Sequence, residues 1–153
     1  MIVRKLHPSE IDLTVNLFSQ YFDEAAEVIP SIADEYEVDA VLETIRNYSS
    51  HWEYSWFNAV DGQRPVGFIA GCITPVPWNH NKVNAHIVFI YLLPSHRNMD
   101  NFRQLLKTFE EWSRNAGAIV ISAGDIGIAP ERTQKLYEHF DFKPNVWMNK
   151  ELN

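Results

Sequence analysis

The chain has 153 residues, a length typical of one domain with a substantial core, and we expect a single domain over residues 1–153. Hydrophobic residues make up 46% of the sequence and aromatic residues 13%, which excludes a disordered protein. The formal net charge of −7 argues against nucleic acid as a partner, because phosphate binding needs a basic face. It suits a neutral or cationic substrate, although a negative surface also serves solubility alone.

Cysteine usage and hydropathy indicate where such a protein resides. Cys72 is the only cysteine, so a disulfide within the chain is excluded and a reducing compartment is expected. The opening segment MIVRKLHPSE lacks the apolar stretch of a signal peptide, and no apolar run approaches the ~20 residues of a membrane span. We therefore expect a cytoplasmic protein with no membrane partner.

The N-terminal third is predicted to hold a strand and two helices. IVRKL, at residues 2–6, alternates as a short strand does, and Ser9 in the segment PSE is a candidate helix cap. Apolar residues then recur at helical spacing, at Ile11, Val15, Leu17, Phe18, Tyr21 and Phe22. Acidic residues and Pro30 interrupt this helix, and a second helix is predicted at residues 34–48.

The middle of the chain is rich in predicted strands. Two of them, residues 54–60 and 66–74, flank the turn DGQRP, whose Asp61-Gly62 pair is typical of a hairpin. The loop PVPWNHNK then precedes a long apolar strand at residues 84–93, as expected at the centre of a sheet.

The C-terminal part alternates between helices and strands. A helix ends near Arg114 at the closing segment NAG, and a buried strand is predicted at residues 118–123. A short helix at residues 130–140 and a last strand at residues 143–149 follow. The order β-α-α-β-β-β-α-β-α-β predicts one α/β domain with a mixed sheet.

The loop LLPSHRNMDNFRQLL, residues 92–106, joins a predicted strand to a helix. Such a junction directs the N–H groups of a helix N-terminus toward an anion. Loops that touch phosphate usually contain glycine, because the backbone must approach closely. This loop contains none, and we interpret it as a changed phosphate loop rather than a helix start that binds nothing.

The element order and this loop resemble the GNAT superfamily of N-acetyltransferases over essentially the whole chain. That family carries V-x-P-x-x-R-x-x-G-x-G/A between its fourth strand and third helix. The matching residues are Leu92, Pro94 and Arg97, and Asp100 and Phe102 stand where glycines are expected. The resemblance implies a GNAT-like mixed β-sheet flanked by helices, with a degenerate, glycine-free pyrophosphate loop.

A second motif near the C-terminus supports the resemblance. The family's L-Y-E-x-x-G-F corresponds to LYEHFDF at residues 136–142, with Asp141 in place of the glycine. The family's frequent Asn seven residues before the Tyr corresponds to Pro130. By resemblance, Tyr137 would be the acid that protonates the departing thiolate, although a core-edge aromatic on an amphipathic helix is nearly as good an explanation.

The resemblance implies transfer of an acetyl group from acetyl-CoA, as co-substrate, to an amine of a small molecule or protein. In the family, the loop and the first helical turn hold the pyrophosphate, and the preceding strand pairs with the pantetheine arm, here through Tyr91 and Leu93. The implied cofactor-binding residues are Tyr91, Leu92, Leu93, Arg97, Asn98, Met99, Asp100, Asn101 and Phe102.

The absent glycines bear on whether the protein is active. Asp100 would place a negative charge near the phosphates, a repulsion of roughly 1.4 kcal/mol or about tenfold in affinity. This favours an alternative, a catalytically inactive GNAT-fold binding or inhibitory module. Arg97, Tyr137 and a candidate base at His86 favour the N-acetyltransferase, which is the prediction we adopt.

His86 is the candidate general base. In the frame HIVFIYL it takes the position of a Glu that the family often has near the start of its fourth strand, and histidine titrates near neutrality. A strand histidine hydrogen-bonded at the sheet surface is an equally good interpretation. His80 and His86 lack cysteines or carboxylates at ligand spacing, so no metal site is expected.

The acceptor of the acetyl group is not identified by any motif. The acidic segment at residues 23–43 lies where the family's first two helices border the acceptor cleft. It could attract an amine, or it could be a solvated face. The sequence leaves the oligomeric state open.

Overall fold

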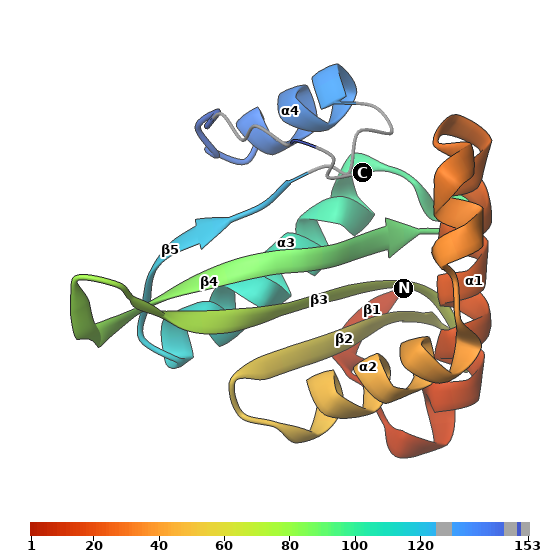
Figure 1. The fold of residues 1–153 in the computed structure, drawn as a ribbon, viewed down its shortest axis with the longest axis horizontal. Helices are drawn as coiled ribbons and strands as arrows, with labels where there is room; N and C mark the ends of the chain where they lie inside the picture. The colour runs from red at the N-terminus through yellow and green to blue at the C-terminus, as the bar shows by residue number, and fades with distance from the viewer. Residues whose placement is uncertain (125–129, 146–149, 151–153) are drawn as a thin grey trace.

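The computed structural model describes residues 1–124, 130–145 and 150, and shows a mixed sheet with helices on both faces (Figure 1). Its helices and strands are β1 (Ile2–Lys5), α1 (Ile11–Val28), α2 (Val38–Ser50), β2 (Tyr54–Asp61), β3 (Arg64–Val76), β4 (Asn79–Leu92), α3 (Met99–Asn115), β5 (Ala118–Ser122) and α4 (Pro130–Glu138). Short 3-10 turns occur at η1 (Pro8–Glu10), η2 (Pro30–Glu35) and η3 (Pro94–His96). The α/β class and the mixed sheet are confirmed.

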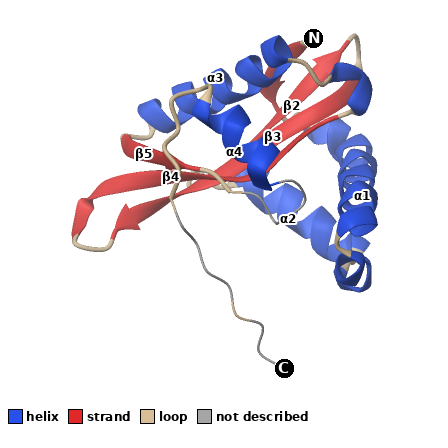
Figure 2. Cartoon of the chain, turned by 90° about the horizontal axis from the view of Figure 1, so that it is seen from above, coloured by secondary structure: helices blue, strands red, loops and turns tan. Residues whose placement is uncertain are grey.

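Within the described residues, five strands form one sheet in the order β1-β2-β3-β4-β5. Neighbours are antiparallel from β1 to β4, and β5 runs parallel to β4. Figure 2 shows α3 on one side of the sheet, and α1 and α2 on the other. Because side chains alternate along each strand, the sheet supplies one apolar layer to each of two cores.

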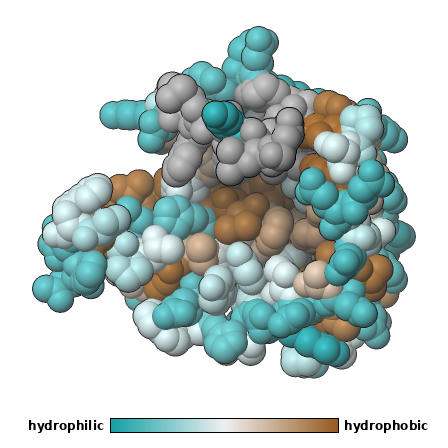
Figure 3. All heavy atoms as spheres, viewed as in Figure 1, coloured by the Kyte–Doolittle hydropathy of each residue, from teal (hydrophilic) through white to brown (hydrophobic). Residues whose placement is uncertain are grey.

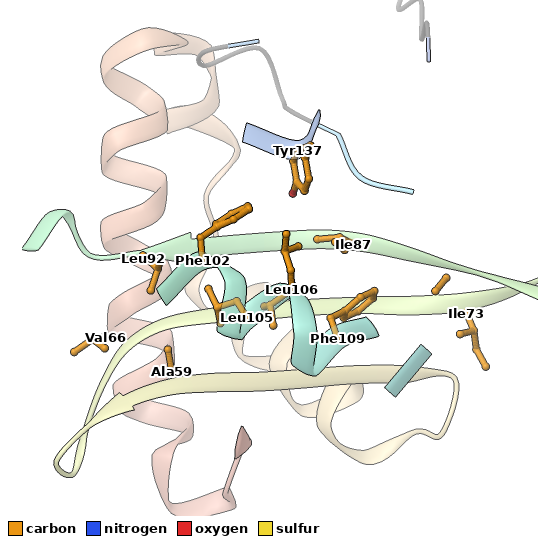
Figure 4. Close-up of a cluster of buried hydrophobic side chains, with 12 residues drawn as sticks. Ala59, Val66, Ile73, Ile87, Leu92, Phe102, Leu105, Leu106, Phe109 and Tyr137 are labelled. Carbon is orange, nitrogen blue, oxygen red and sulfur yellow. The ribbon is translucent and has the colours of Figure 1, made fainter. Parts of the chain in front are cut away.

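The first core lies between α3 and the sheet (Figure 4). Leu105 and Phe109 of α3 are fully buried and share this core with Ile69 of β3 and Ala85 of β4. The helix buries these residues because its apolar positions recur every three or four residues. This packing fixes the N-terminus of α3 close to the end of β4.

The second core is aromatic and holds α1 on the opposite face. The ring of Phe18 lies 5.6 Å from that of Phe68, 6.0 Å from that of Trp56 and 5.1 Å from that of Phe89, measured between centroids. Such pairs contribute about 0.5–1.5 kcal/mol each beyond the burial of their area. They position the C-terminal half of α1 beside the end of β4.

The predicted cap at Ser9 is wrong, because the segment around it forms η1 before α1 begins. His7 is the N-cap of that turn, and its ring accepts the N–H of Ser9. The Glu10 carboxylate accepts the N–H of His7 and pairs with Arg4. Burial raises the pKa of Glu10, but the hydrogen bonds from Arg4 and His7 outweigh burial and hold this pKa below its ordinary value of 4.5.

Two predicted boundaries in the first half of the chain also change. The second helix begins at Val38 instead of residue 34, because residues 30–35 form η2 and Glu37 is extended. The predicted loop PVPWNHNK is mostly strand, since β3 and β4 remain paired as far as Val76 and Asn79. The β3–β4 hairpin is therefore longer than the apolar pattern indicated.

The C-terminal strands differ from prediction as well. The strand predicted to be buried, now β5, exposes 56% of Ile119 and 54% of Val120, because in the described residues it pairs with β4 alone. Of the last predicted strand, residues 143–145 have no regular secondary structure and residues 146–149 lie outside the described residues.

Candidate functional site

The sheet splits between β4 and β5. The two strands pair at Val83↔Ala118, Ala85↔Ile121 and His86↔Ser122, and no pair between described residues follows. Beyond this point β4 continues while β5 diverges from it (Figure 1). The split leaves backbone N–H and C=O groups on the last residues of β4 available to a ligand.

A bulge in β4 lies at the start of this open edge. Ala70 pairs with Phe89, but the next residue on β3, Gly71, pairs with Ile87, so Val88 is an extra residue. A bulge bends its strand and increases the local twist. Here the bulge lies just beyond the last β4–β5 pair, at the point where the two strands separate.

A cleft of about 840 Å³ lies over the open edge of β4. It is enclosed by β4, the loop before α3, the end of α1 and one face of α4. Figure 3 shows apolar side chains gathered in a hollow on this face, with hydrophilic side chains around it. Of the expected cofactor-binding residues, those that line the cleft are Tyr91, Leu92, Arg97, Asn98, Met99 and Phe102.

The N-terminus of α3 lies beside this cleft, and Asn98 and Met99 line it. Asn98 caps the helix, and its side-chain oxygen accepts the N–H of Asn101 at 2.9 Å. The backbone carbonyl of Asn98 accepts the N–H of Phe102 at 3.1 Å. No acceptor among the described residues takes the N–H of Met99 or of Asp100. Two donors at the positive end of the helix dipole are therefore available to an anion.

The residues that replace glycine in this loop do not block it. Asp100 and Phe102 lie inside α3, where the backbone is helical and the left-handed φ that favours glycine is not needed. The ring of Phe102 turns into the core and lies 5.8 Å from the ring of Tyr137 (Figure 4). The Phe102 side chain thus leaves the backbone accessible from the cleft.

Asp100 and Asn101 do not line the cleft. The Asp100 carboxylate accepts a hydrogen bond from Arg103 at 2.6 Å, and its side chain is 83% exposed. The Asn101 side chain donates to the carbonyl of His96 at 2.8 Å. The negative charge of Asp100 is therefore exposed to solvent and paired with a cation.

Arg97 is paired with a residue that no motif indicated. Its Nη2 donates to Glu24 at 2.5 Å and its Nε to the Leu92 carbonyl at 2.8 Å, and the guanidinium lies 5.3 Å above the ring of Tyr91. The Tyr91 hydroxyl donates to the other oxygen of Glu24 at 2.6 Å. Burial, with the hydrogen bond to Glu24, raises the pKa of Tyr91 well above its usual range.

Along β4, the backbone N–H and C=O groups of alternate residues point toward β3 and toward the open edge. The N–H of Leu93 donates to a carbonyl on β3 at 2.9 Å, so Tyr91, two residues earlier, also directs its backbone groups to β3. The carbonyl of Leu92 points the other way, toward Arg97. The backbone groups on this edge that point away from β3 are therefore those of Ile90 and Leu92, whereas the expected pantetheine contacts were Tyr91 and Leu93.

Tyr137 reaches the cleft from the last turn of α4. It is buried and borders both the cleft and the core beneath α3 (Figure 4). The N–H of Phe142 donates to the carbonyl of Tyr137, and that of Asp141 donates to the carbonyl of Glu138. These bonds form a Schellman motif, whose left-handed residue is Asp141 at φ 66°. The conformation explains why the family has glycine at this position.

His86 lies at the last pair before the split and is not part of the cleft lining. Its Nε2 lies 2.8 Å from the hydroxyl of Thr74 and its Nδ1 2.5 Å from that of Ser122. The neighbouring residue, Ile87, does line the cleft. His86 is therefore a strand histidine hydrogen-bonded at the sheet surface. Its role as general base stays a prediction.

Several cleft residues were not predicted to act together. Arg132 and Lys135 line the cleft from α4 and His139 lines it from the turn that follows, while Glu24 and Glu27 line it from α1. Arg132 and Lys135 are three residues apart, so the helix places them on one face. One wall of the cleft is therefore basic and the opposite wall is acidic.

Two further properties concern only the part of the chain that the structure describes. No group of three or more His, Cys, Asp or Glu side chains there could hold a metal ion. No helix there has the length and apolar character needed to cross a membrane.

The split sheet, its open strand edge and the adjoining helix N-terminus form the α/β arrangement that the sequence resemblance implied for an acyltransferase. The sequence model of the acetyltransferase (GNAT) family matches residues 15–142, most of the chain. The chain therefore belongs to this family. It is an N-acetyltransferase, and acetyl-CoA is its co-substrate.

Solved structures share the fold over the whole chain. A probable acetyltransferase is 17% identical, with 100% of this chain and 97% of that chain covered and a TM-score of 0.78. Aminoglycoside N-acetyltransferase AAC(6')-Iy in complex with CoA is 16% identical, with coverage of 99% and 93% and a TM-score of 0.76. A predicted acetyltransferase from Clostridium acetobutylicum with acetyl-CoA is also 16% identical, with coverage of 99% and 94% and a TM-score of 0.73. No curated protein matches the sequence.

Proposed function

We propose that the protein acetylates the amine of a small cationic molecule, within a single domain spanning residues 1–153. The observation that carries this proposal is the division of charge across the cleft, with Glu24 and Glu27 on one wall and basic side chains on the other. The acidic wall attracts an ammonium group and the basic wall attracts the phosphates of acetyl-CoA. A volume of about 840 Å³ suits a small molecule beside the pantetheine arm.

The residues present fit the co-substrate. The N–H groups of Met99 and Asp100 would hold the pyrophosphate at the positive end of α3. Backbone groups of Ile90 and Leu92 would pair with the amides of the pantetheine arm, as a further strand would. Arg132 and Lys135, exposed on α4, would contact phosphate from the facing wall.

The reaction requires two proton transfers. The nitrogen of the neutral amine forms a bond to the thioester carbonyl carbon, the bond from that carbon to sulfur breaks, and the products are an acetamide and CoA. Tyr137, buried beside the cleft, would give its hydroxyl proton to the departing thiolate. His86 would take the amine proton through an intervening hydroxyl or water, since it does not itself line the cleft.

Two measurements test the proposal. Calorimetric titration with acetyl-CoA should give a dissociation constant well below 1 mM, and a weaker value, worth only about 4 kcal/mol, would leave no credible catalyst. A coloured thiol reagent should then report release of CoA with 1,4-diaminobutane but not with glutamate, whose carboxylates the acidic wall repels. Turnover of glutamate alone would contradict a cationic acceptor.

A further inference from the structure

Arg97 occupies positions that the substrates of the proposed reaction need. Its Nε donates a hydrogen bond to the Leu92 carbonyl, which lies on the open edge of β4. Its Nη2 donates to the Glu24 carboxylate on the acidic wall. Arg97 itself is a cation at the cleft beside the N-terminus of α3. The Arg97 side chain thus links three parts of the proposed site. They are the open edge of β4, the acidic wall and the loop before α3.

The contacts of Arg97 are exchangeable. The side chains of Arg97 and Glu24 are 40% and 37% exposed, so water screens their ion pair. A pyrophosphate carries more negative charge than one carboxylate and accepts two parallel N–H bonds from a guanidinium. A pantetheine amide that bonds to Leu92 would also remove the acceptor of Arg97 Nε. Both events favour movement of Arg97 from Glu24 to the phosphates.

Glu24 keeps one partner when Arg97 leaves. The Tyr91 hydroxyl donates to its other oxygen at 2.6 Å, and Tyr91 is buried between the sheet and α1. The raised pKa of Tyr91 keeps this hydroxyl a donor at neutral pH. The carboxylate would therefore stay in the cleft, negatively charged and with one oxygen available.

Resting on the function proposed above, we propose that Glu24 is a binding residue for the ammonium group of the acceptor and that Arg97 controls access to it. Arg97 holds Glu24 until acetyl-CoA binds, and the phosphates then draw Arg97 away. Acetyl-CoA and the acceptor consequently strengthen each other's binding, because linkage is reciprocal. Glu24 is then the specificity determinant of the acceptor site, and Arg97 couples this site to the co-substrate.

The first test compares Glu24→Gln with Asp23→Asn. Both remove one negative charge from the same turn of α1, but Asp23 neither lines the cleft nor pairs with Arg97. Glu24→Gln should tighten acetyl-CoA binding by about threefold to fivefold in calorimetry, since Arg97 no longer has a competing carboxylate. Acetyl-pantetheine, which lacks the pyrophosphate, should show less than half of this gain. If the two variants bound acetyl-CoA with equal affinity, the proposed movement of Arg97 from Glu24 to the phosphates would be overturned.

The second test uses Arg97→Gln, which frees Glu24 without touching α1. This variant should bind acetyl-CoA more weakly, yet bind 1,4-diaminobutane in the absence of acetyl-CoA more tightly than the wild type does. Glu24→Gln should raise the KM for 1,4-diaminobutane at least tenfold, with kcat nearly unchanged. A loss of kcat with an unaltered KM would show that Glu24 supports structure instead of binding the acceptor.

The two proposals fail in different ways. A wild-type protein that binds no acetyl-CoA overturns the proposed function, and the exchange falls with it. A wild-type protein that acetylates 1,4-diaminobutane, with Glu24→Gln and Asp23→Asn alike in affinity and KM, overturns the exchange alone. Thermal unfolding of each variant separates these results from misfolding.

Discussion

Phe109 of α3 packs directly against Gly71 of β3, because glycine has no side chain to keep the ring away from the strand. A Cβ atom on Gly71 would lie 2.6 Å from Cζ of Phe109 and 2.0 Å from the carbonyl oxygen of His86. Gly71 pairs with Ile87, beside the bulge in β4. The helix α3 is therefore seated on the sheet close to the point where β4 and β5 separate.

Gly71→Ala should lower the free energy of unfolding by about 1–3 kcal/mol, because the added methyl group overpacks a closed site. Urea unfolding of the variant measures this change. Gly124→Ala is a matched control, since a Cβ there meets no atom within 4 Å. If the two variants were equally stable, the contact with Phe109 would not be as tight as the structure shows.

Replacing Asp141 by glycine should stabilise the protein, and replacing it by alanine should destabilise it. Its φ of 66° is left-handed, which glycine adopts without strain and aspartate tolerates better than alanine. We expect Asp141→Gly to gain about 0.5 kcal/mol and Asp141→Ala to lose about 1 kcal/mol. Thermal unfolding should rank the proteins in the order Gly, Asp, Ala, and a reversed order would contradict the Schellman motif.

Tyr137→Phe should lower kcat about tenfold to a hundredfold and leave the affinity for acetyl-CoA nearly unchanged. The ring keeps its contacts with Phe102 and Phe142, so the variant should fold as the wild type does. Steady-state kinetics and calorimetry separate the two quantities. An unchanged kcat would remove Tyr137 from the proton transfers.

His86→Ala should abolish an acidic limb of the pH–rate profile, because a general base must be unprotonated to accept the amine proton. The wild-type rate should therefore fall as pH decreases. Ser122→Ala removes one hydroxyl partner of the ring and should displace the limb without abolishing it. A limb that survives in His86→Ala would assign the base to another residue or to water.

Asp100→Gly should tighten acetyl-CoA binding by less than about threefold. The sequence predicted about tenfold, but the carboxylate is 83% exposed and paired with Arg103, so solvent and a cation weaken its repulsion of phosphate. Calorimetry at low and high salt checks the effect, which should be smaller at high salt. A tenfold gain would mean that Asp100 faces the pyrophosphate after all.

Local sequence patterns determined much of this protein. Helical spacing and strand alternation predicted the order of elements as far as α4, since each element must present an apolar face to a core. The motifs around Arg97 and Tyr137 identified the family, and both residues border the cleft. These features depend on residues within a few positions of one another, which a single sequence displays directly.

The tertiary structure alone decided how the site is assembled. Glu24 meets Arg97 across 73 residues, and no periodicity relates the two positions. The bulge at Val88 and the split beyond His86 depend on how β4 packs against β3 and β5, so the strand pattern does not reveal them. Side-chain direction is likewise set by available partners, which is why Asp100 turns to Arg103 and Phe102 turns into the core. Long-range contacts of this kind arise only when the chain has folded.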